Sequence, residues 1–221
     1  NFFKLFIKSK QKFIYKKNNF KEFHQVEKYT KFINDSLKIS LPIGPLVIHS
    51  RELLEKKLSS KNQNKPLLGI NPGASYGNAK RWYPQEFSEV IAALSNKYDI
   101  TILGGPDEIE IAMDIQRLIV KKGVNNYKNL AGKLSITELI NNISNLDLFI
   151  TGDSGPMHIA PIMKTNSFVI IENYFTQDRF FPYKIDYNTK DKMPILIKAS
   201  KGRKISDISE KKVIKIILNN C

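Results

Sequence analysis

The chain has 221 residues, of which 42% are hydrophobic, enough to bury one sizeable core with appendages. Its formal net charge of +14 favours anionic partners, whether nucleic acid, phosphorylated ligands or an anionic membrane surface. The single cysteine, Cys221, excludes an intrachain disulfide and indicates a reducing compartment. No apolar run approaches the roughly 18 residues that a transmembrane helix needs.

The first 50 residues are strongly basic and are predicted to form a flanking or linker segment. Residues 1–40 hold ten lysines against three acidic residues, which is +7 of the total charge of +14. Residues 20–37 have a helical pattern, and "PIGP" at 42–45 then breaks the chain. The lysines suit either a contact strip for lipid headgroups or another polyanion, or simply a solvated face. Because residue 1 is not Met, we expect the chain to begin within a longer protein.

From residue 66 onward, short apolar runs alternate with amphipathic helical patterns. Strands are predicted at residues 67–71, 99–105, 146–151 and 166–171, and helices at 84–98, 106–123, 135–144, 156–163 and 208–220. Strand, loop and helix alternate at least four times, which predicts an α/β fold with a Rossmann-like parallel sheet flanked by helices. Residues 51–205 are assigned to this nucleotide-sugar-binding domain and residues 206–221 to a C-terminal helix.

The helix predicted at 135–144 carries the clearest local signals. Ser135 and Glu138 have the spacing of a capping box, which marks a helix start. The apolar residues that follow are spaced as one buried stripe: Ile136, Leu139, Ile140 and Ile143.

Three loops follow predicted strands and are rich in small or polar residues: 72–82, 104–108 and 151–156. In an open parallel sheet, ligands bind beyond the carboxyl ends of the strands, where loops of this kind meet. The topology therefore predicts one shared ligand site.

The loop "TGDSGP" at 151–156 is similar to the surroundings of the nucleophilic serine in trypsin-like proteases. That chemistry needs a β-barrel with an upstream His and Asp and usually disulfides, which does not suit βα units in a chain with one cysteine. The G-x-S-x-G elbow of the α/β hydrolases is not matched either. We therefore predict that Ser154 is not a nucleophile.

An anion site explains the same loop better. Because a strand precedes it and Pro156 opens a helix, free N–H groups and the helix dipole point into the loop. Gly155 lets a ligand approach the backbone, and Ser154 can add a hydroxyl donor. Asp153 offers an acceptor for a sugar hydroxyl or for the helix cap. His158 either donates to a phosphate or hydroxyl, or is an ordinary core histidine.

Loop 72–82 is also suited to binding an anion. Lys80 and Arg81 supply positive charge, and Trp82, the only tryptophan, most simply anchors the loop on the core. Small residues leave the backbone accessible: Gly73, Ala74, Ser75 and Gly77. The loop is not a P-loop, because the required glycine and lysine would fall where Asn78 and Ala79 stand.

Loop 104–108, "GGPDE", offers the carboxylates of Asp107 and Glu108 where a ribose diol needs acceptors. Acidic residues are also favoured at any helix N-terminus, which explains this loop when it is taken alone. The sequence has no D-x-D and no metal-ligand spacing. Lys80 and helix N-termini are therefore expected to offset the charge of a bound diphosphate.

Together these loops resemble those of the ADP-heptose:lipopolysaccharide heptosyltransferases, a family with the GT-B architecture. The similar stretches are "NPGASYGNAKRWYPQEF", "ILGGPDE", "LAGKLSITELINNISNLDLFITGDSGPMHIA" and "ISDISEKKVIKIIL", which cover about residues 66–220. The stretch "NPGASYGNAKRWYPQEF" is more similar to that of heptosyltransferase II than to that of heptosyltransferase I.

The resemblance implies two Rossmann-like domains, of which this chain supplies the C-terminal, donor-binding one. It implies inverting transfer of a heptose from ADP-heptose to the lipopolysaccharide or lipooligosaccharide inner core, with no metal, no cofactor and no nucleic acid. It also implies a cytoplasmic protein, peripheral at the inner membrane of a Gram-negative bacterium, where basic residues 1–40 are a candidate membrane contact.

The resemblance also assigns roles to individual residues. Lys80 would contact the diphosphate, with Ser75 nearby, and Leu134 would border the adenine. Either Asp107 or Glu108 would hold the ribose. Four residues would line the phosphates and the heptose: Asp153, Ser154, Gly155 and His158.

Two features depart from the family. Its N-terminal domain, which carries the acceptor contacts and the general base, is matched here only by the approach to the interdomain linker, so we name no catalytic base. The stretch "ENYFTQDRFFPY" stands where the family has a glycine-proline-threonine loop, with Arg179 as a candidate acceptor contact. Two alternatives stay open: a GT-B enzyme with a UDP or GDP donor, and a non-catalytic polyanion or membrane-surface binding domain.

Overall fold

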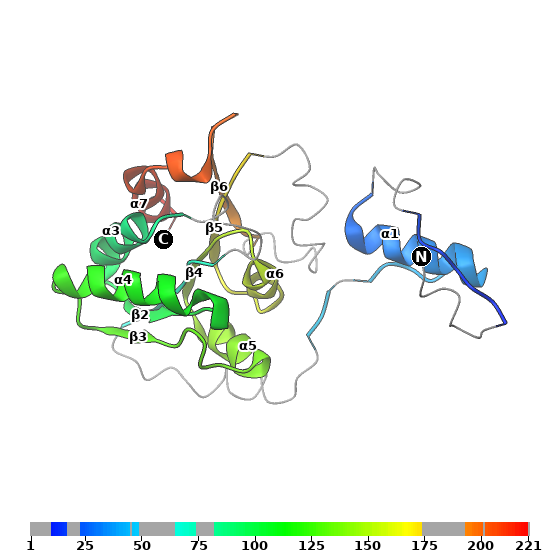
Figure 1. Ribbon diagram of the computed structural model, residues 1–221, viewed down its shortest axis with the longest axis horizontal. Helices are drawn as coiled ribbons and strands as arrows, with labels where there is room; N and C mark the ends of the chain where they lie inside the picture. The colour runs from blue at the N-terminus through cyan, green and yellow to red at the C-terminus, as the bar shows by residue number, and fades with distance from the viewer. Residues whose placement is uncertain are drawn as a thin grey trace.

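Six parallel strands form one sheet in the order β3-β2-β1-β4-β5-β6 (Figure 1). The structure is a computed structural model, and it describes residues 10–16, 23–44, 46–48, 65–73, 82–173, 193–200 and 202–220. The strands are β1 (Leu67–Asn71), β2 (Asp99–Ile102), β3 (Tyr127–Asn129), β4 (Leu148–Thr151), β5 (Ser167–Ile171) and β6 (Ile195–Lys198). The order reverses between β1 and β4, the point at which Rossmann-like sheets bind their ligands.

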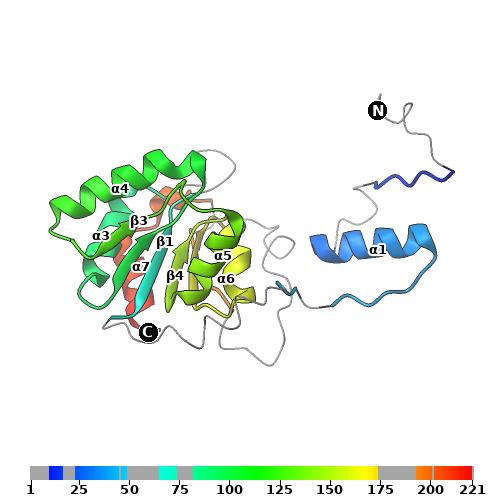
Figure 2. The ribbon, with the colours of Figure 1, turned by 90° about the horizontal axis from the view of Figure 1, so that it is seen from below.

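Helices cover both faces of the sheet, as the predicted α/β fold requires (Figures 1 and 2). One face carries α3 (Pro84–Leu94), α4 (Ile109–Lys121) and α7 (Glu210–Leu218), with α3 packed against both of the others. The opposite face carries α5 (Ile136–Asn145) and α6 (Gly155–Ile162), which pack against each other. Short 3-10 turns, η4 (Pro106–Glu108) and η7 (Ile205–Asp207), precede α4 and α7.

Alternate residues of the central strands fill the two cores. Leu68 and Ile70 of β1 point into the larger core with α3, α4 and α7. Leu103 and Phe149 lie in the smaller core beneath α5 and α6. Since these strands are buried on both faces, they are continuous apolar runs, which is why they could be predicted from the sequence.

The structure ends β2 at Ile102 and α3 at Leu94, earlier than predicted, and it also differs from the prediction at the edge strands and at Ile136. The edge strands β3 and β6 were not predicted, because β3 has only three residues, two of them polar, and β6 exposes its first and last residues. Ile136, expected in a buried stripe, is 72% exposed, because it is the first residue of α5 and lies before the helix meets the core. The capping box of Ser135 and Glu138 is confirmed, with Ser135 Oγ accepting from the Glu138 N–H at 3.3 Å.

The helix α1 (Gln25–Leu37) lies apart from the sheet and its helices (Figures 1 and 2). His24 caps it, because its Nδ1 accepts from the Val26 N–H at 3.2 Å. Tyr15 packs against α1, with ring centroids 5.3 Å from Tyr29 and 5.4 Å from Phe32. Within the described parts of the chain, no helix is long and apolar enough to cross a membrane.

Candidate functional site

The loops that leave β1 and β4 are joined by a buried polar network where the strand order reverses. Asn71 and Thr151 are register partners at the carboxyl ends of these two strands. Asn71 Oδ1 accepts from the Gly73 N–H at 3.2 Å and from Ser154 Oγ at 3.4 Å. The hydroxyls of Thr151 and Ser154 are 3.2 Å apart. Asn71, Thr151 and Ser154 are 1%, 0% and 8% exposed, so the network is shielded from water.

Glycines bring the backbones of these loops into contact. A β-carbon built on Gly152 would lie 3.2 Å from the carbonyl oxygen of Gly73. A β-carbon on Gly73 would overlap the Glu108 carboxylate, so that side chain lies directly against the Gly73 backbone. The β1 loop is therefore held between the β2 and β4 loops.

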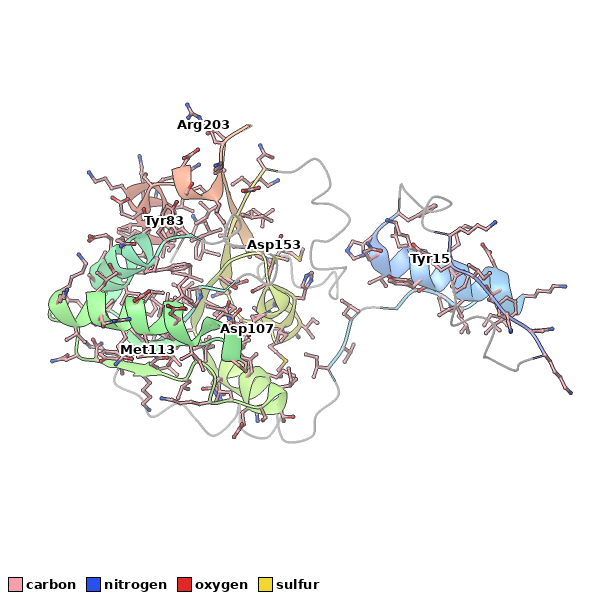
Figure 3. The ribbon with its side chains drawn as sticks, viewed as in Figure 1. Tyr15, Tyr83, Asp107, Met113, Asp153 and Arg203 are labelled. Atoms are coloured by element: carbon pink, nitrogen blue, oxygen red, sulfur yellow. The ribbon has the colours of Figure 1, made fainter. Side chains whose placement is uncertain are left out.

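Glu108 also closes its own turn, since its carboxylate accepts the Gly105 N–H in a short hydrogen bond. The loop after β3 lies next to the β2 loop, because the Gly132 N–H donates to the Gly104 carbonyl at 2.9 Å. The loops after β4, β1, β2 and β3 therefore form one row of contacting loops. Leu134 follows and packs against the smaller core. Asp107, by contrast, is exposed on η4. Figure 3 labels Asp107 there and Asp153 in the turn before α6.

The start of α6 has the geometry of an anion site. Ser154 is its N-cap residue in extended conformation, but its side chain makes no capping bond. Pro156 has no N–H, and the Met157 N–H donates to the Ser154 carbonyl at 3.1 Å. Gly155 is exposed, and a β-carbon added to it would meet nothing within 4 Å. A ligand can therefore approach the backbone at Gly155, next to the positive end of the helix.

His158 lies half-buried in the first turn of α6. Burial lowers the pKa of His158 below its usual 6.5, the charge of Asp153 raises it, and His24 of α1 lowers it further. Burial is the largest of these effects, so the imidazole is neutral at pH 7 and can donate one hydrogen bond.

The environment of Ser154 does not fit a nucleophile. Its hydroxyl is buried and bonds to Thr151 and Asn71, whereas a serine nucleophile needs an adjacent base. Trp82 is 1% exposed and its Nε1–H donates to the Ile208 carbonyl at 2.8 Å, which confirms its predicted anchoring role. Ser75, Lys80 and Arg179 lie outside the described residues, and all the proposed ligand contacts stay predictions.

Sequence reasoning overlooked Asn71 and Thr151. Each is the polar last residue of an otherwise apolar strand. These two strands, β1 and β4, are the neighbours between which the strand order reverses. A buried polar side chain needs a hydrogen-bond partner, so a polar residue in this place was a usable signal. Among the residues that the structure describes, no group of three or more His, Cys, Asp or Glu side chains could hold a metal ion.

Comparison with known proteins decides the family. Residues 9–171 match the family described as glycosyltransferase family 9 (heptosyltransferase). The chain belongs to glycosyltransferase family 9. This family 9 chain is 39% identical over 173 residues to lipooligosaccharide heptosyltransferase 2 of Campylobacter jejuni serotype O:2, covering 77% of this chain and 54% of that protein. It is 30% identical over 102 residues to lipopolysaccharide heptosyltransferase 2 of Salmonella typhimurium, covering 46% of this chain and 29% of that protein.

Solved structures share the fold of this family 9 chain. ADP-heptose lps heptosyltransferase II of E. coli superposes with a TM-score of 0.73 at 20% identity, covering 94% of this chain and 64% of that one. The E. coli heptosyltransferase WaaC with ADP superposes with a TM-score of 0.63 at 16% identity, covering 90% and 57%. The predicted resemblance and the predicted α/β fold are confirmed. The chain spans about half the length of the Campylobacter jejuni relative, and the match to the Salmonella typhimurium relative covers less than a third of that protein.

Proposed function

We propose that this chain is the donor-binding domain of a glycosyltransferase that transfers a heptose from ADP-heptose to the lipopolysaccharide or lipooligosaccharide inner core. The observation that carries the proposal is its family 9 membership, together with relatives named heptosyltransferase 2. The open start of α6, at the point where the strand order reverses, supports binding of a diphosphate there.

The arrangement of the loops suggests how the donor lies. The diphosphate would sit at Gly155 and the α6 N-terminus, with Lys80 and Ser75 supplied by the β1 loop. The ribose would lie toward the β2 loop, where Glu108 is held against Gly73. The adenine would lie beyond it near Leu134, on the loop after β3. This order follows the row of contacts from β4 through β1 and β2 to β3.

The residues around α6 suggest roles in catalysis. In an inverting transfer, the acceptor hydroxyl attacks the anomeric carbon, the bond to the diphosphate oxygen breaks, and a base takes the hydroxyl proton. The developing charge on the diphosphate would be offset by the helix N-terminus, by Lys80 and by a hydrogen bond from neutral His158, without a metal or cofactor. Asp153, next to His158, would accept from a heptose hydroxyl. The resemblance assigns the base to the N-terminal domain of the family, so we name none in this chain.

We further propose that the protein acts at the inner face of the inner membrane, where its acceptor would be found. Ten lysines in residues 1–40 support this, and so do the side chains of Phe13 and Ile14, which are 47% and 52% exposed. Cationic residues beside exposed apolar ones suit the surface of an anionic bilayer.

Thermal unfolding with competing nucleotides tests the donor class. ADP should raise the Tm of the chain more than UDP or GDP at equal concentration, because ligands that bind the native state stabilise it. A larger shift with UDP or GDP would favour another GT-B donor. Salt-sensitive binding to nucleic acid or anionic vesicles, with no nucleotide effect, would favour the non-catalytic alternative.

A further inference from the structure

We infer that Asn71 is a positioning residue for the donor diphosphate, and this inference rests on the proposed function. Asn71 does not reach the open side of the site, since it is 1% exposed. It acts instead through the two loops that its amide oxygen joins. Those loops are the ones proposed to hold the diphosphate.

The hydrogen bonds define what Asn71 fixes. Its Oδ1 accepts from the Gly73 N–H at 3.2 Å, which sets the first turn of the β1 loop. The same oxygen accepts from Ser154 Oγ at 3.4 Å, which sets the residue immediately before α6. Asn71 thereby controls the distance between the β1 loop and the α6 N-terminus.

Other features of the network make Asn71 hard to replace. The Thr151 hydroxyl donates to the Gly152 carbonyl at 3.2 Å and lies 3.2 Å from that of Ser154, so it can accept from Ser154. The Asn71 amide, by contrast, is the acceptor that also holds the Gly73 N–H. Gly73 and Gly152 are in backbone contact, which leaves no space for a bridging side chain. Without the amide, the Gly73 N–H would need a new buried partner, and Ser154 would keep only Thr151, so the link between the two loops would be lost.

Calorimetric titration of ADP into the chain tests the inference. Asn71→Leu keeps the number and branching of the side-chain heavy atoms and removes the acceptor, and it should weaken ADP binding about tenfold, the effect of one or two lost hydrogen bonds. Ser154→Ala should act on the same network. The double variant should therefore bind ADP about as weakly as Asn71→Leu alone, because residues in one network are not additive.

Asn126→Leu is the matched control. The Asn126 side chain donates to the carbonyls of Ser95 and Tyr98 and to the Asp99 carboxylate, at the amino end of β2. Its loss should lower stability without changing the Kd for ADP. Equal loss of ADP affinity in Asn126→Leu and Asn71→Leu would overturn the positioning role, because it would show a general effect of destabilisation.

Asn71→Asp covers the case in which Asn71→Leu does not fold. It keeps an oxygen acceptor, but places a negative charge beneath the proposed diphosphate. Its Kd for ADP should be raised relative to wild type, and added salt should restore the wild-type value only in part, because a charge at this buried position is weakly screened. An unchanged Kd in whichever Asn71 variant folds would overturn the inference while leaving the proposed function intact. Failure of the wild-type chain to bind ADP would instead overturn the proposed function, and the inference with it.

Discussion

The carbonyl oxygen of Gly73 lies against Gly152, so that a β-carbon at position 152 would stand 3.2 Å from it. This contact joins the loops after β1 and β4, which leave neighbouring strands where the sheet order reverses. Few real β-carbons approach a backbone atom so closely, and backbone cannot rotate away as a side chain can. The close approach of the two loops therefore depends on glycine.

Gly152→Ala should lower the free energy of unfolding by about 1 to 3 kcal/mol, the usual effect of overpacking a tight site. It should also weaken ADP binding, because one of the two loops must move. Gly155→Ala is the comparison, since a β-carbon there meets nothing within 4 Å. It should fold with unchanged or slightly higher stability, yet lose ADP affinity by blocking approach to the backbone. Urea unfolding measures the stability of both variants, and calorimetric titration measures their affinity for ADP. Full ADP affinity in Gly155→Ala would show that the ligand does not approach there.

Trp82→Phe should lower the free energy of unfolding by about 2 kcal/mol. The change removes the Nε1–H that bonds the Ile208 carbonyl at 2.8 Å and leaves that buried acceptor without a donor. It also disturbs the edge-to-face contact with Phe87, whose ring centroid lies 5.0 Å away. Tyr83→Phe is the control. Tyr83 is 54% exposed, so removing its hydroxyl should change the free energy of unfolding by less than about 0.5 kcal/mol. Equal unfolding midpoints for the two variants would contradict this account of Trp82.

Much of this fold could be predicted from the sequence, for a physical reason. Central strands such as Leu148–Thr151 are buried on both faces and are therefore apolar except for the polar residue at the end. The capping box at Ser135 and the proline at the start of α3 are local signals that need no tertiary information. The edge strand β6 exposes its first and last residues, and its pairing with β5 is a long-range contact that no local pattern encodes.

The candidate site could be predicted as a set of loops but not as a network. The strand-loop-helix order is enough to place Gly155 and Glu108 at one edge of the sheet. That Glu108 packs on Gly73 and that Ser154 bonds to Asn71 depends on the order in which the strands pair. Asn71 and Ser154 are 83 residues apart in the chain, so only the fold brings them together.

The structure separates the two candidate ribose ligands. Glu108 is held against Gly73 at the centre of the loop row, whereas Asp107 is exposed on η4. Glu108→Gln should therefore reduce the preference of the chain for ADP over 2′,3′-dideoxy-ADP, because a carboxylate accepts from the diol more strongly than an amide. Asp107→Asn should leave that preference as in wild type. A loss of preference in Asp107→Asn instead would assign the ribose to Asp107.

His158 should make stability depend on pH. Its pKa is lowered in the folded chain, mainly by burial, whereas in the unfolded chain it returns to about 6.5. The unfolded chain therefore binds the proton more readily, so the contribution is present in full above pH 6.5 and is lost as the pH falls toward the lowered folded value. The difference in unfolding free energy between wild type and His158→Gln should shift against wild type between pH 7 and pH 5. A difference that is constant over this range would contradict a lowered pKa.

We propose that the chain binds the donor nucleotide where the strand order reverses. Titration of the ¹⁵N-labelled chain with ADP, followed through its backbone amide resonances, tests this most directly. We expect the largest shifts at Gly73 and at the non-proline residues of 152–158 and 104–108, with ADP binding more tightly than UDP or GDP. Shifts confined to the opposite edge of the sheet, or no shifts at millimolar ADP, would contradict the account.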